Sequence, residues 1–386
     1  MRGHIRRRGK RSWAVVLEAG RDPTTGKRRQ KWVSVKGTRR DAQQRMTELL
    51  RAYDTGTSIE PSKLTVGCYL DRWLADYAAA SVRPRTFQRY EIAVRCHLKP
   101  TLGAIPLQSL APGHILDALS YWSTQGRVDR TGGLSPQSCL HNFRILREAL
   151  GHAVKWRFLV RNPAEDVKAP RVPETEVSIF SDDDLTAILG ACRHHELGPA
   201  VQFTLLTGVR RGELLGLRWS DINDERRTVH IQQTVYRLNG GEFVFAPPKT
   251  QRGRRAIALT RVAEAAIRKQ RISQAKRRFQ LGPAFIDHDL VFDAGSGVPR
   301  DQNNFSRAWK RLLQDAGVKH RAFHTCRHQF ATLLLRSGEH PKVVSEALGH
   351  SSISVTMDVY SHVMPEMQRD AMDRLDERFS ALVASA

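Results

Sequence analysis

The sequence predicts a multidomain, mainly α-helical protein with small β elements. Its 386 residues correspond to two or three domains at about 100–200 residues each. Two segments rich in Pro, Gly, Ser and Thr and poor in bulky apolar residues, 55–62 and 169–176, divide the chain. Apolar residues at helical spacing fill most of the chain after the first segment, whereas strand-like alternation is confined to short runs. We therefore expect domains at residues 1–57, 64–168 and 177–386.

The composition is that of an ordinary soluble protein, with 40% apolar and 26% charged residues. It has no run of 18 apolar residues, and the apolar stretch Trp13–Leu17 is too short for the core of a signal peptide. The five cysteines are scattered and form no Cys-x-x-Cys pair. A disulfide framework and a structural zinc site are therefore not expected, and a reducing cytoplasm fits best.

The net charge of +23 points to a polyanionic partner. An anionic membrane surface is one such partner, but it would require a basic amphipathic helix or a lipidation signal, and neither is evident. Nucleic acid is therefore the favoured partner. About half of the excess lies in residues 1–50, where 15 Lys and Arg face 4 acidic residues.

The first part of the chain reads as short strands followed by a helix. Strand-like runs cover Trp13–Leu17 and residues 30–35, with a turn at residues 22–26 between them. A helix is predicted to open at Thr38 and to run through Leu50. This basic, tryptophan-containing segment suggests a small DNA-binding module, although a solvated terminal arm is the alternative.

The middle part is predicted to be a bundle of helices. One begins near Val66, a second follows Pro84, a third contains Leu116 and Leu119, and a long fourth covers residues 140–156. The bundle is either a structural spacer or, given the basic segments around it, part of a DNA clamp.

The last part is predicted to be one mainly helical domain. Ser181 caps a helix whose first turn holds three aspartates at the positive end of the helix dipole. Strand-like runs at residues 229–238, 242–245 and 255–259 interrupt the helices. The chain ends in an amphipathic helix whose apolar stripe consists of Met372, Leu375, Phe379, Leu382 and Val383.

Four short motifs in this part carry the residues suited to chemistry. The first, Thr207–Trp219, contains a helix end at Gly208 and a new helix start beside Arg210, a geometry suited to binding an anion. The second, residues 247–259, reads as a hairpin with a basic tip and Lys249 on its incoming strand. Taken singly, each is compatible with an ordinary surface position.

The third and fourth motifs add two histidines, an arginine and a tyrosine. In residues 323–332, His324 and Arg327 share a helix face. His324 and His328 could form a metal pair, but no carboxylate lies at a ligand-like spacing from them. In the fourth motif, His350 follows a glycine-marked helix end, and Tyr360 lies ten residues farther on. A lone tyrosine is most often a half-buried core residue, and here a nucleophile is the alternative.

Together these motifs resemble the tyrosine recombinase (phage integrase) family. The segments TGVRRGELLGLRW, PPKTQRGRR, HTCRHQFAT and LGHSSISVTMDVYSHV occur in the order and spacing of that family. The middle part resembles its SAM-like core-binding helical domain, and the first part its three-stranded arm-binding domain. Cys326 departs from the apolar residue usual at its position, which indicates a core location for this side chain.

The resemblance implies a role for each site residue. Arg210, Arg327 and His350 would bind the scissile phosphate, because planar guanidinium forks match the charge that grows on its oxygens. Tyr360 would attack, with His324 accepting its proton and Lys249 protonating the leaving 5′ oxygen. The 3′-phosphotyrosyl bond would store the phosphodiester energy, so no cofactor, metal or ATP is expected. Glu213 is expected to hold Arg210 or a histidine.

The resemblance also implies partners. These are double-stranded attachment-site DNA, a homotetramer on that DNA, and accessory factors such as a host DNA-bending protein and an excision factor. The C-terminal helix would dock on a neighbouring protomer, and folding back on its own domain is the alternative. No membrane partner is expected, and the location would be the bacterial cytoplasm, at the nucleoid. Two other functions remain open: a type IB topoisomerase, and a DNA-binding protein that has lost catalysis. A recombinase, unlike the topoisomerase, would need a particular sequence to join two marked DNA molecules. Tyr360→Phe would leave a pure DNA-binding protein unaffected and would inactivate the enzyme.

Overall fold

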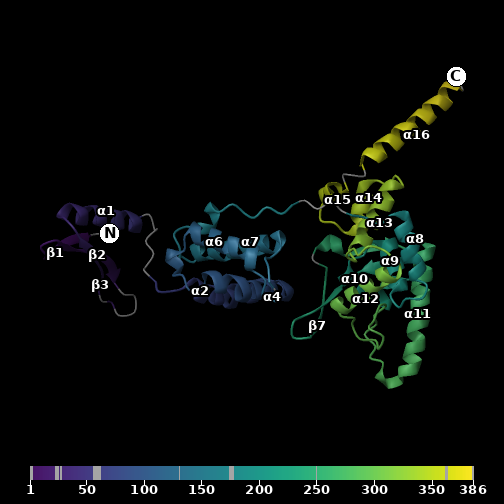
Figure 1. Ribbon diagram of the computed structural model, residues 1–386, viewed down its shortest axis with the longest axis horizontal. Helices are drawn as coiled ribbons and strands as arrows, with labels where there is room; N and C mark the ends of the chain where they lie inside the picture. The colour runs from purple at the N-terminus through teal and green to yellow at the C-terminus, as the bar shows by residue number, and fades with distance from the viewer. Residues whose placement is uncertain are drawn as a thin grey trace. The chain divides into compact units, whose positions relative to one another are not determined.

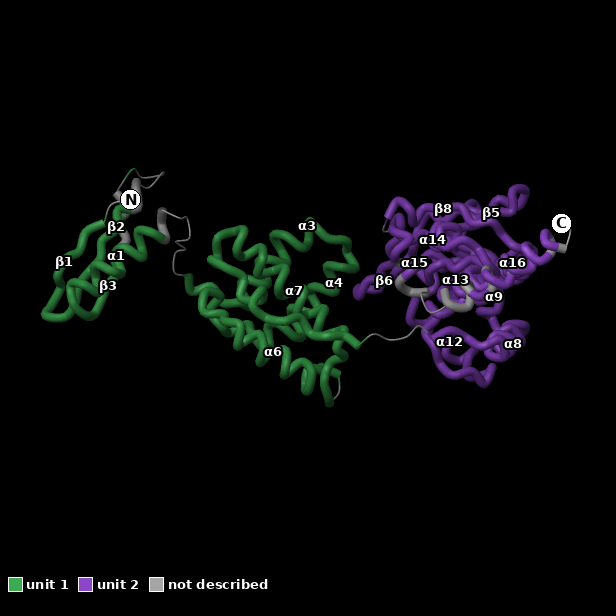
Figure 2. Tube along the Cα trace, turned by 90° about the horizontal axis from the view of Figure 1, so that it is seen from above, with its two compact units in different colours: residues 1–174 green, residues 175–386 purple. Residues whose placement is uncertain are grey.

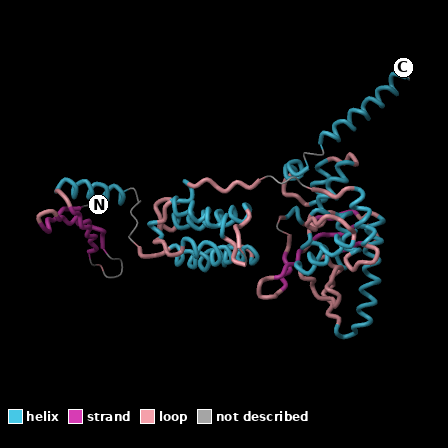
Figure 3. Tube along the Cα trace, viewed as in Figure 1, coloured by secondary structure: helices cyan, strands magenta, loops and turns pink. Residues whose placement is uncertain are grey.

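The computed structural model describes residues 3–21, 26, 28–54, 62–129, 131–173, 178–248, 250–360 and 364–384. It consists of two compact units, residues 1–174 and 175–386 (Figure 2). Figure 3 shows strands near the N-terminus and in short pieces of the second unit, with helices and connecting loops elsewhere. The predicted mainly α fold with small β elements is confirmed. Among the described residues, no helix has the length and apolarity needed to cross a bilayer.

The N-terminal module is a three-stranded antiparallel sheet with one helix. Its elements are β1 (Gly3–Gly9), β2 (Ser12–Arg21), β3 (Arg28–Lys36) and α1 (Arg39–Asp54). The predicted helix start at Thr38 is confirmed, and it is capped there, since the Asp41 carboxylate accepts a hydrogen bond from the Thr38 backbone N–H at 2.7 Å. Ala42 of α1 packs with Val15 and Leu17 of β2 to form the core. The turn predicted at residues 22–26 lies mostly outside the described residues.

The helical bundle contains every predicted helix. Its helices are α2 (Val66–Trp73), α3 (Ala79–Ser81), α4 (Pro84–Ala93), α5 (Lys99–Leu102), α6 (Pro112–Gln125) and α7 (Pro136–Lys155). Two π-helical turns, Leu74–Ala78 and Val94–Leu98, connect α2 to α3 and α4 to α5. Apolar spacing does not predict such turns, because one extra residue per turn shifts the stripe without interrupting it.

Buried aromatic residues set the core of the bundle. Tyr69, Trp73 and Trp122 are fully buried. The Trp73 ring stacks on Tyr90 with centroids 5.3 Å apart, and its Nε1–H donates to His152 Nδ1 at 2.8 Å. The indole therefore packs without leaving its polar atom unpaired.

The second unit holds the remaining helices, and Figure 1 shows α13, α14 and α15 close together in it. The Ser181–Asp184 capping box confirms the predicted start of the first helix of this unit. The helices are α8 (Asp182–Ala191), α9 (Gly198–Thr207), α10 (Arg211–Leu215), α11 (Arg261–Leu281), α12 (Gln302–Asp315), α13 (Thr325–Arg336), α14 (Pro341–Leu348), α15 (Ile353–Tyr360) and α16 (Met364–Ala384).

Two predictions about the strands of this unit were wrong. The run at residues 229–238 is two strands in two different sheets, and residues 247–259 are not a hairpin. One sheet has the order β4 (Ile222–Asn223), β5 (Thr228–Ile231), β8 (Arg255–Ala258), and the other pairs β6 (Thr234–Arg237) with β7 (Phe243–Ala246). Because Pro247 and Pro248 lack an N–H, they end β7 instead of extending its ladder. The chain then crosses from one sheet to the other.

The C-terminal helix is confirmed as α16 (Figure 1). The side chains of its predicted apolar stripe are between 46% and 75% exposed: Met372, Leu375, Phe379, Leu382 and Val383.

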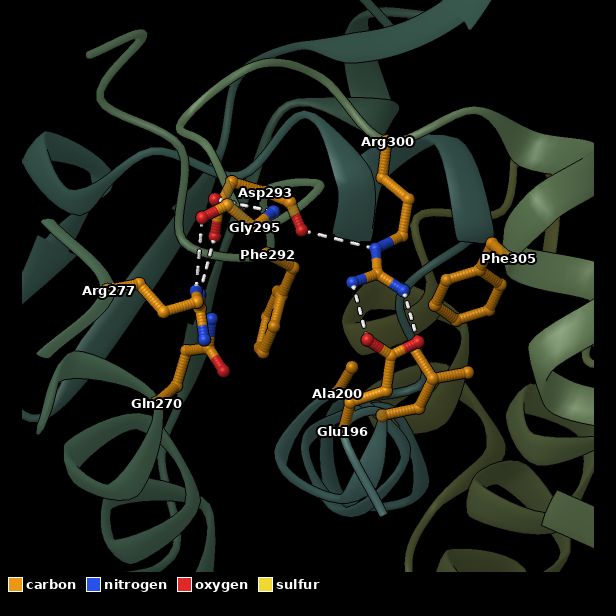
Figure 4. Close-up of a pocket in the computed structure, with 10 residues that line it drawn as sticks. Glu196, Ala200, Gln270, Arg277, Phe292, Asp293, Gly295, Arg300 and Phe305 are labelled. Atoms are coloured by element: carbon orange, nitrogen blue, oxygen red, sulfur yellow. Dashed lines mark hydrogen bonds and ion pairs between the residues drawn. The ribbon is translucent and has the colours of Figure 1, made fainter. Parts of the chain in front are cut away.

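A small cavity of about 60 Å³ lies among α9, α11 and the segment before α12 (Figure 4). Arg300 donates to both carboxylate oxygens of Glu196, and Asp293 accepts from Arg277 Nη2 at 2.9 Å. The same Asp293 carboxylate accepts from the backbone N–H groups of Gly295 and Gly297, each at 2.8 Å. These charged groups bind one another, so the cavity is a structural junction between segments and not the candidate site.

Candidate active site

Arg210 lies at the sharp turn between α9 and α10. Helix α9 ends at Gly208, which has a left-handed φ of 62° and confirms the predicted glycine cap. A Cβ on Gly208 would lie 2.4 Å from Cδ1 of Phe330, so a larger residue does not fit. The chain reverses there, and α10 begins with Arg210 as its N-cap residue. The arginine that sequence analysis selected is therefore placed by a turn that only glycine can form.

The buried carboxylate of Glu213 holds Arg210 from two directions. Its Oε1 accepts from Arg210 Nη1 at 2.7 Å, and its Oε2 accepts from the Arg210 backbone N–H at 3.0 Å. The expectation that Glu213 holds Arg210 is thus confirmed. Burial acts to raise the pKa of Glu213, but the adjacent Arg255 and Arg210 outweigh it and lower that pKa below its usual range. Glu213 is therefore a carboxylate at neutral pH.

Arg327 is buried in the first turn of α13, with 2% of its surface exposed. Its Nη1 donates to the carbonyl of Gly208 at 2.7 Å, and its Nη2 donates to the carbonyl of Leu348 at 2.6 Å. One guanidinium thus joins the turn that carries Arg210 to the end of α14. Burial of a charged group is costly unless hydrogen bonds compensate it, and these two carbonyls contribute to that compensation.

His324 precedes Arg327 as the N-cap residue of α13. Its ring meets that of His328 edge-on, with centroids 4.8 Å apart. Burial, and then the proximity of His328, Arg327 and Arg210, lowers the pKa of His324 to about 4. The imidazole is therefore neutral at neutral pH and can accept a proton.

His350 is presented by the end of α14. Gly349 caps that helix with a left-handed φ of 66°, and the His350 backbone N–H bonds the carbonyl of Ser345 at 3.0 Å. On the ring, Nδ1 lies 2.7 Å from the hydroxyl of Thr356 in α15, which leaves Nε2 for another partner. Burial, and then Arg327 and Arg210, lowers the pKa of His350 to about 4.

Four of the six predicted residues are brought together: Arg210, His324, Arg327 and His350. Arg210 and Arg327 donate to adjacent carbonyls, Gly349 and Leu348, and the electrostatic influence of both reaches both histidines. These residues come from α10, α13 and α14, which are more than 100 residues apart at the extremes. Beside His350 lies an open hollow of about 780 Å³ whose lining includes Arg252, Arg254 and Lys342. The arrangement offers fixed cations and neutral imidazoles to an anion.

The other two predicted residues are described less completely. Lys249 lies outside the described residues. Tyr360 is the last residue of α15, one helical turn beyond Thr356, and its side chain lies outside what the structure describes. The hydrogen bond between Thr356 and His350 joins α15, the helix that ends at Tyr360, to the loop that carries His350.

Metal binding at the histidines finds no support in the donor set. Among the described residues, no group of three or more His, Cys, Asp and Glu side chains is placed to hold a metal ion. His324 and His328 have the guanidinium of Arg327 close by, which repels a cation. Cys326, between them, is fully buried in the core, as predicted from its departure from the family pattern.

Sequence analysis missed Arg255. Its side chain is 6% exposed and donates from Nη2 to Glu213 Oε2 at 2.9 Å. The sequence did contain one signal. Arg255 and the buried Ile257 are two positions apart in β8, so their side chains lie on the same face of the strand. An arginine in phase with a core residue on a strand indicates a buried ion pair.

Two family models match the chain. The model described as the phage integrase family matches residues 179–367, and that described as the N-terminal SAM-like domain of phage integrases matches residues 65–123. A tyrosine recombinase XerC-like protein of Caldanaerobacter subterraneus is 29% identical, over 96% of this chain and 97% of that protein. The ICEBs1 integrase of Bacillus subtilis is 24% identical, over 95% and 97% respectively.

Solved structures share the fold. The Tn1549 transposon integrase, in complex with a circular intermediate DNA, aligns with a TM-score of 0.68 and 22% identity, over 81% of this chain and 99% of that one. A lambda integrase tetramer bound to a Holliday junction aligns with a TM-score of 0.58 and 19% identity, over 91% and 94%.

Proposed function

The chain belongs to the phage integrase family of tyrosine recombinases, and we propose that it integrates and excises a mobile DNA element through a 3′-phosphotyrosyl intermediate. Enzymes of this family cleave and rejoin DNA without metal or ATP. Six residues carry the proposed chemistry: Arg210, Lys249, His324, Arg327, His350 and Tyr360. The observation that supports it most is the convergence of two arginines and two neutral histidines from three separate helices.

The arginines bind the scissile phosphate and stabilise the transition state. The side chain of Arg210 is 40% exposed and can reach a ligand. Arg327 is buried, and the carbonyls of Gly208 and Leu348 fix its guanidinium group. The attack creates a pentacovalent phosphorus with added negative charge on its non-bridging oxygens, and preorganised cations favour that state over the ground state. His350, with Nδ1 engaged by Thr356, offers Nε2 to the same phosphate.

Tyr360 attacks the phosphorus, and the 5′ oxygen leaves. A phenol with an ordinary pKa near 10 is protonated at neutral pH, so its proton must be accepted. His324 is neutral and suited to accept it. Binding of the DNA phosphate adds negative charge beside His324, which raises its basicity at the moment it is needed. Lys249 donates a proton to the leaving 5′ oxygen, and reversal of these steps with a new 5′ hydroxyl rejoins the strand.

The remaining parts of the chain bind DNA and assemble the complex. We assign residues 1–57 to arm-site DNA, residues 64–168 to the core site, and residues 177–386 to catalysis. Strand exchange between two duplexes requires four protomers, and α16 is the proposed connection between neighbours. A host DNA-bending protein and an excision factor are further proposed partners, and the bacterial cytoplasm is the proposed location.

The test is formation of a covalent protein–DNA adduct. The full chain is incubated in EDTA with a nicked substrate carrying the element's end, and the products are separated under denaturing conditions. We expect an adduct with the natural chain and none with Tyr360→Phe. Tyr121→Phe, at an exposed tyrosine of α6, is the matched control and should still form the adduct, because Tyr121 lies outside the unit that holds the site residues. Binding of a verified site without an adduct would contradict the mechanism.

A further inference from the structure

The end of α14 is a meeting point for three guanidinium groups. Three successive carbonyl oxygens of this helix end each accept a hydrogen bond from a different arginine: Ala347 from Arg255 Nε at 2.6 Å, Leu348 from Arg327 Nη2 at 2.6 Å, and Gly349 from Arg210 Nη2 at 3.4 Å. Carbonyls at a helix C-terminus lack partners within the helix and carry the negative end of its dipole, so they favour cations. Two of the three arginines are assigned to the reaction above, and Arg255 is not.

Arg255 uses its guanidinium entirely within the protein. Its Nε bonds Ala347, its Nη1 donates to the carbonyl of Gly253 at 3.1 Å, and its Nη2 donates to Glu213 at 2.9 Å. With its side chain 6% exposed, it offers little surface to a substrate. It therefore acts on the reaction through other residues.

The charges around Glu213 give Arg255 a specific task. The single negative charge of Glu213 faces two guanidinium groups, those of Arg210 and Arg255. The three groups together carry a net charge of about +1 at neutral pH. Without Arg255, Glu213 would neutralise Arg210 alone, and the cluster would present no net positive charge to a phosphate.

The backbone before β8 is packed tightly against the loop that carries His350. A Cβ on Gly349 would lie 2.8 Å from the carbonyl oxygen of Arg252 and 3.0 Å from Cδ of Arg255. In addition, Arg252 Nη1 donates to the carbonyl of Ser351 at 2.5 Å. Displacement of Arg255 would therefore also shift the backbone of residues 349–351, which carries His350.

We propose that Arg255 is a positioning residue that supplies the counter-charge for Glu213 and anchors the end of α14, so that Arg210 keeps its charge for the scissile phosphate. This inference rests on the proposed function. It predicts that the cost of losing Arg255 comes from an unbalanced Glu213 and is relieved when that carboxylate is removed as well.

The test compares single-turnover rates of adduct formation, at saturating substrate, for the natural chain and four variants. The variants are Arg255→Gln, Glu213→Gln, the double variant Glu213→Gln/Arg255→Gln, and Arg300→Gln. Arg300→Gln breaks the partly exposed ion pair with Glu196 in the same unit (Figure 4). It is the control for an effect that comes only from lost stability. DNA affinity and Tm are measured for each variant.

We expect Arg255→Gln to slow adduct formation roughly 100-fold while DNA affinity changes little, because a misplaced group at the reacting centre costs about that much. The double variant should react about tenfold faster than Arg255→Gln, a coupling typical of residues in one ion-pair network. Arg300→Gln should lower Tm and leave the rate within about threefold of the natural chain, because distant sites act independently. A purely structural role for Arg255 would give no rescue by Glu213→Gln.

Three outcomes would overturn the inference: a rate for Arg255→Gln near that of the natural chain, no recovery in the double variant, or a similar slowing by Arg300→Gln. If Arg255→Gln does not fold, the double variant is compared with Glu213→Gln, and a large difference in rate between them contradicts the counter-charge role. Absence of an adduct with the natural chain would instead contradict the proposed function itself, so the two failures are distinguishable.

Discussion

At the scale of single residues, burial among cations decides the state of the site histidines. His324 and His350 both have a pKa of about 4, first because they are buried and then because arginines surround them. An exposed histidine with the ordinary value of 6.5 would be half protonated in mildly acidic solution. The site therefore keeps a proton acceptor and a neutral hydrogen-bonding ring across the physiological range.

This state predicts the pH dependence of adduct formation. At subsaturating protein, the rate reports ionisations of the free enzyme. Because the pKa of His324 is lowered, its accepting form is populated at all pH values above about 5, and the rate should stay flat on this limb between about pH 5.5 and 8. The measurement is the second-order rate constant of adduct formation as a function of pH. A sigmoidal rise centred near the ordinary histidine pKa would contradict the role of His324 in its described surroundings.

At the scale of elements, two glycine-capped helix ends create the site. Gly208 ends α9 and Gly349 ends α14, both with a left-handed backbone. Phe330 and Leu348 fill the space in which a side chain at Gly208 would lie, and these two residues belong to one small core between α13 and α14. The turns bring Arg210 and His350 to the same place although they are 140 positions apart in the sequence.

Replacement of Gly208 by alanine tests this construction. The left-handed backbone and the contact with Phe330 should together cost about 2–4 kcal/mol of stability and reduce adduct formation. Gly190, inside α8, is the matched control, since a Cβ there meets nothing within 4 Å. Alanine at Gly190 should be neutral or stabilise by up to about 1 kcal/mol. Urea unfolding of both variants gives the comparison, and an equal effect of the two would contradict the argument.

At the scale of the whole molecule, the positive charge lies largely outside the candidate active site. Residues 1–57 carry a net charge of +11, nearly half of the total of +23. The two arginines proposed for catalysis, Arg210 and Arg327, are instead held by carbonyls and by Glu213. We therefore expect the affinity for DNA and the rate of cleavage to depend on different parts of the chain.

Removal of residues 1–57 should separate these two properties. The shortened chain should still form an adduct on a core-type site, because the site residues all lie in the second unit. Its DNA affinity should be lower and less dependent on salt, since each lost phosphate contact reduces the slope of log K against log salt by about 0.9. Anisotropy titrations between about 50 and 200 mM salt measure that slope. An unchanged slope, or loss of the adduct, would contradict this division.

Sequence alone determined the fold class and the local helix ends. Apolar spacing and capping residues act over a few neighbouring positions. For this reason they correctly placed the cap at Ser181 and the glycine ends of helices at Gly208 and Gly349. The four motifs also indicated the family. Tertiary structure decided which strands pair and which charges meet. Residues 228–237 divide between two sheets, and Arg255 reaches Glu213 from 42 positions away. Such pairings depend on long-range packing and on the balance of buried charge, which no short stretch of sequence contains.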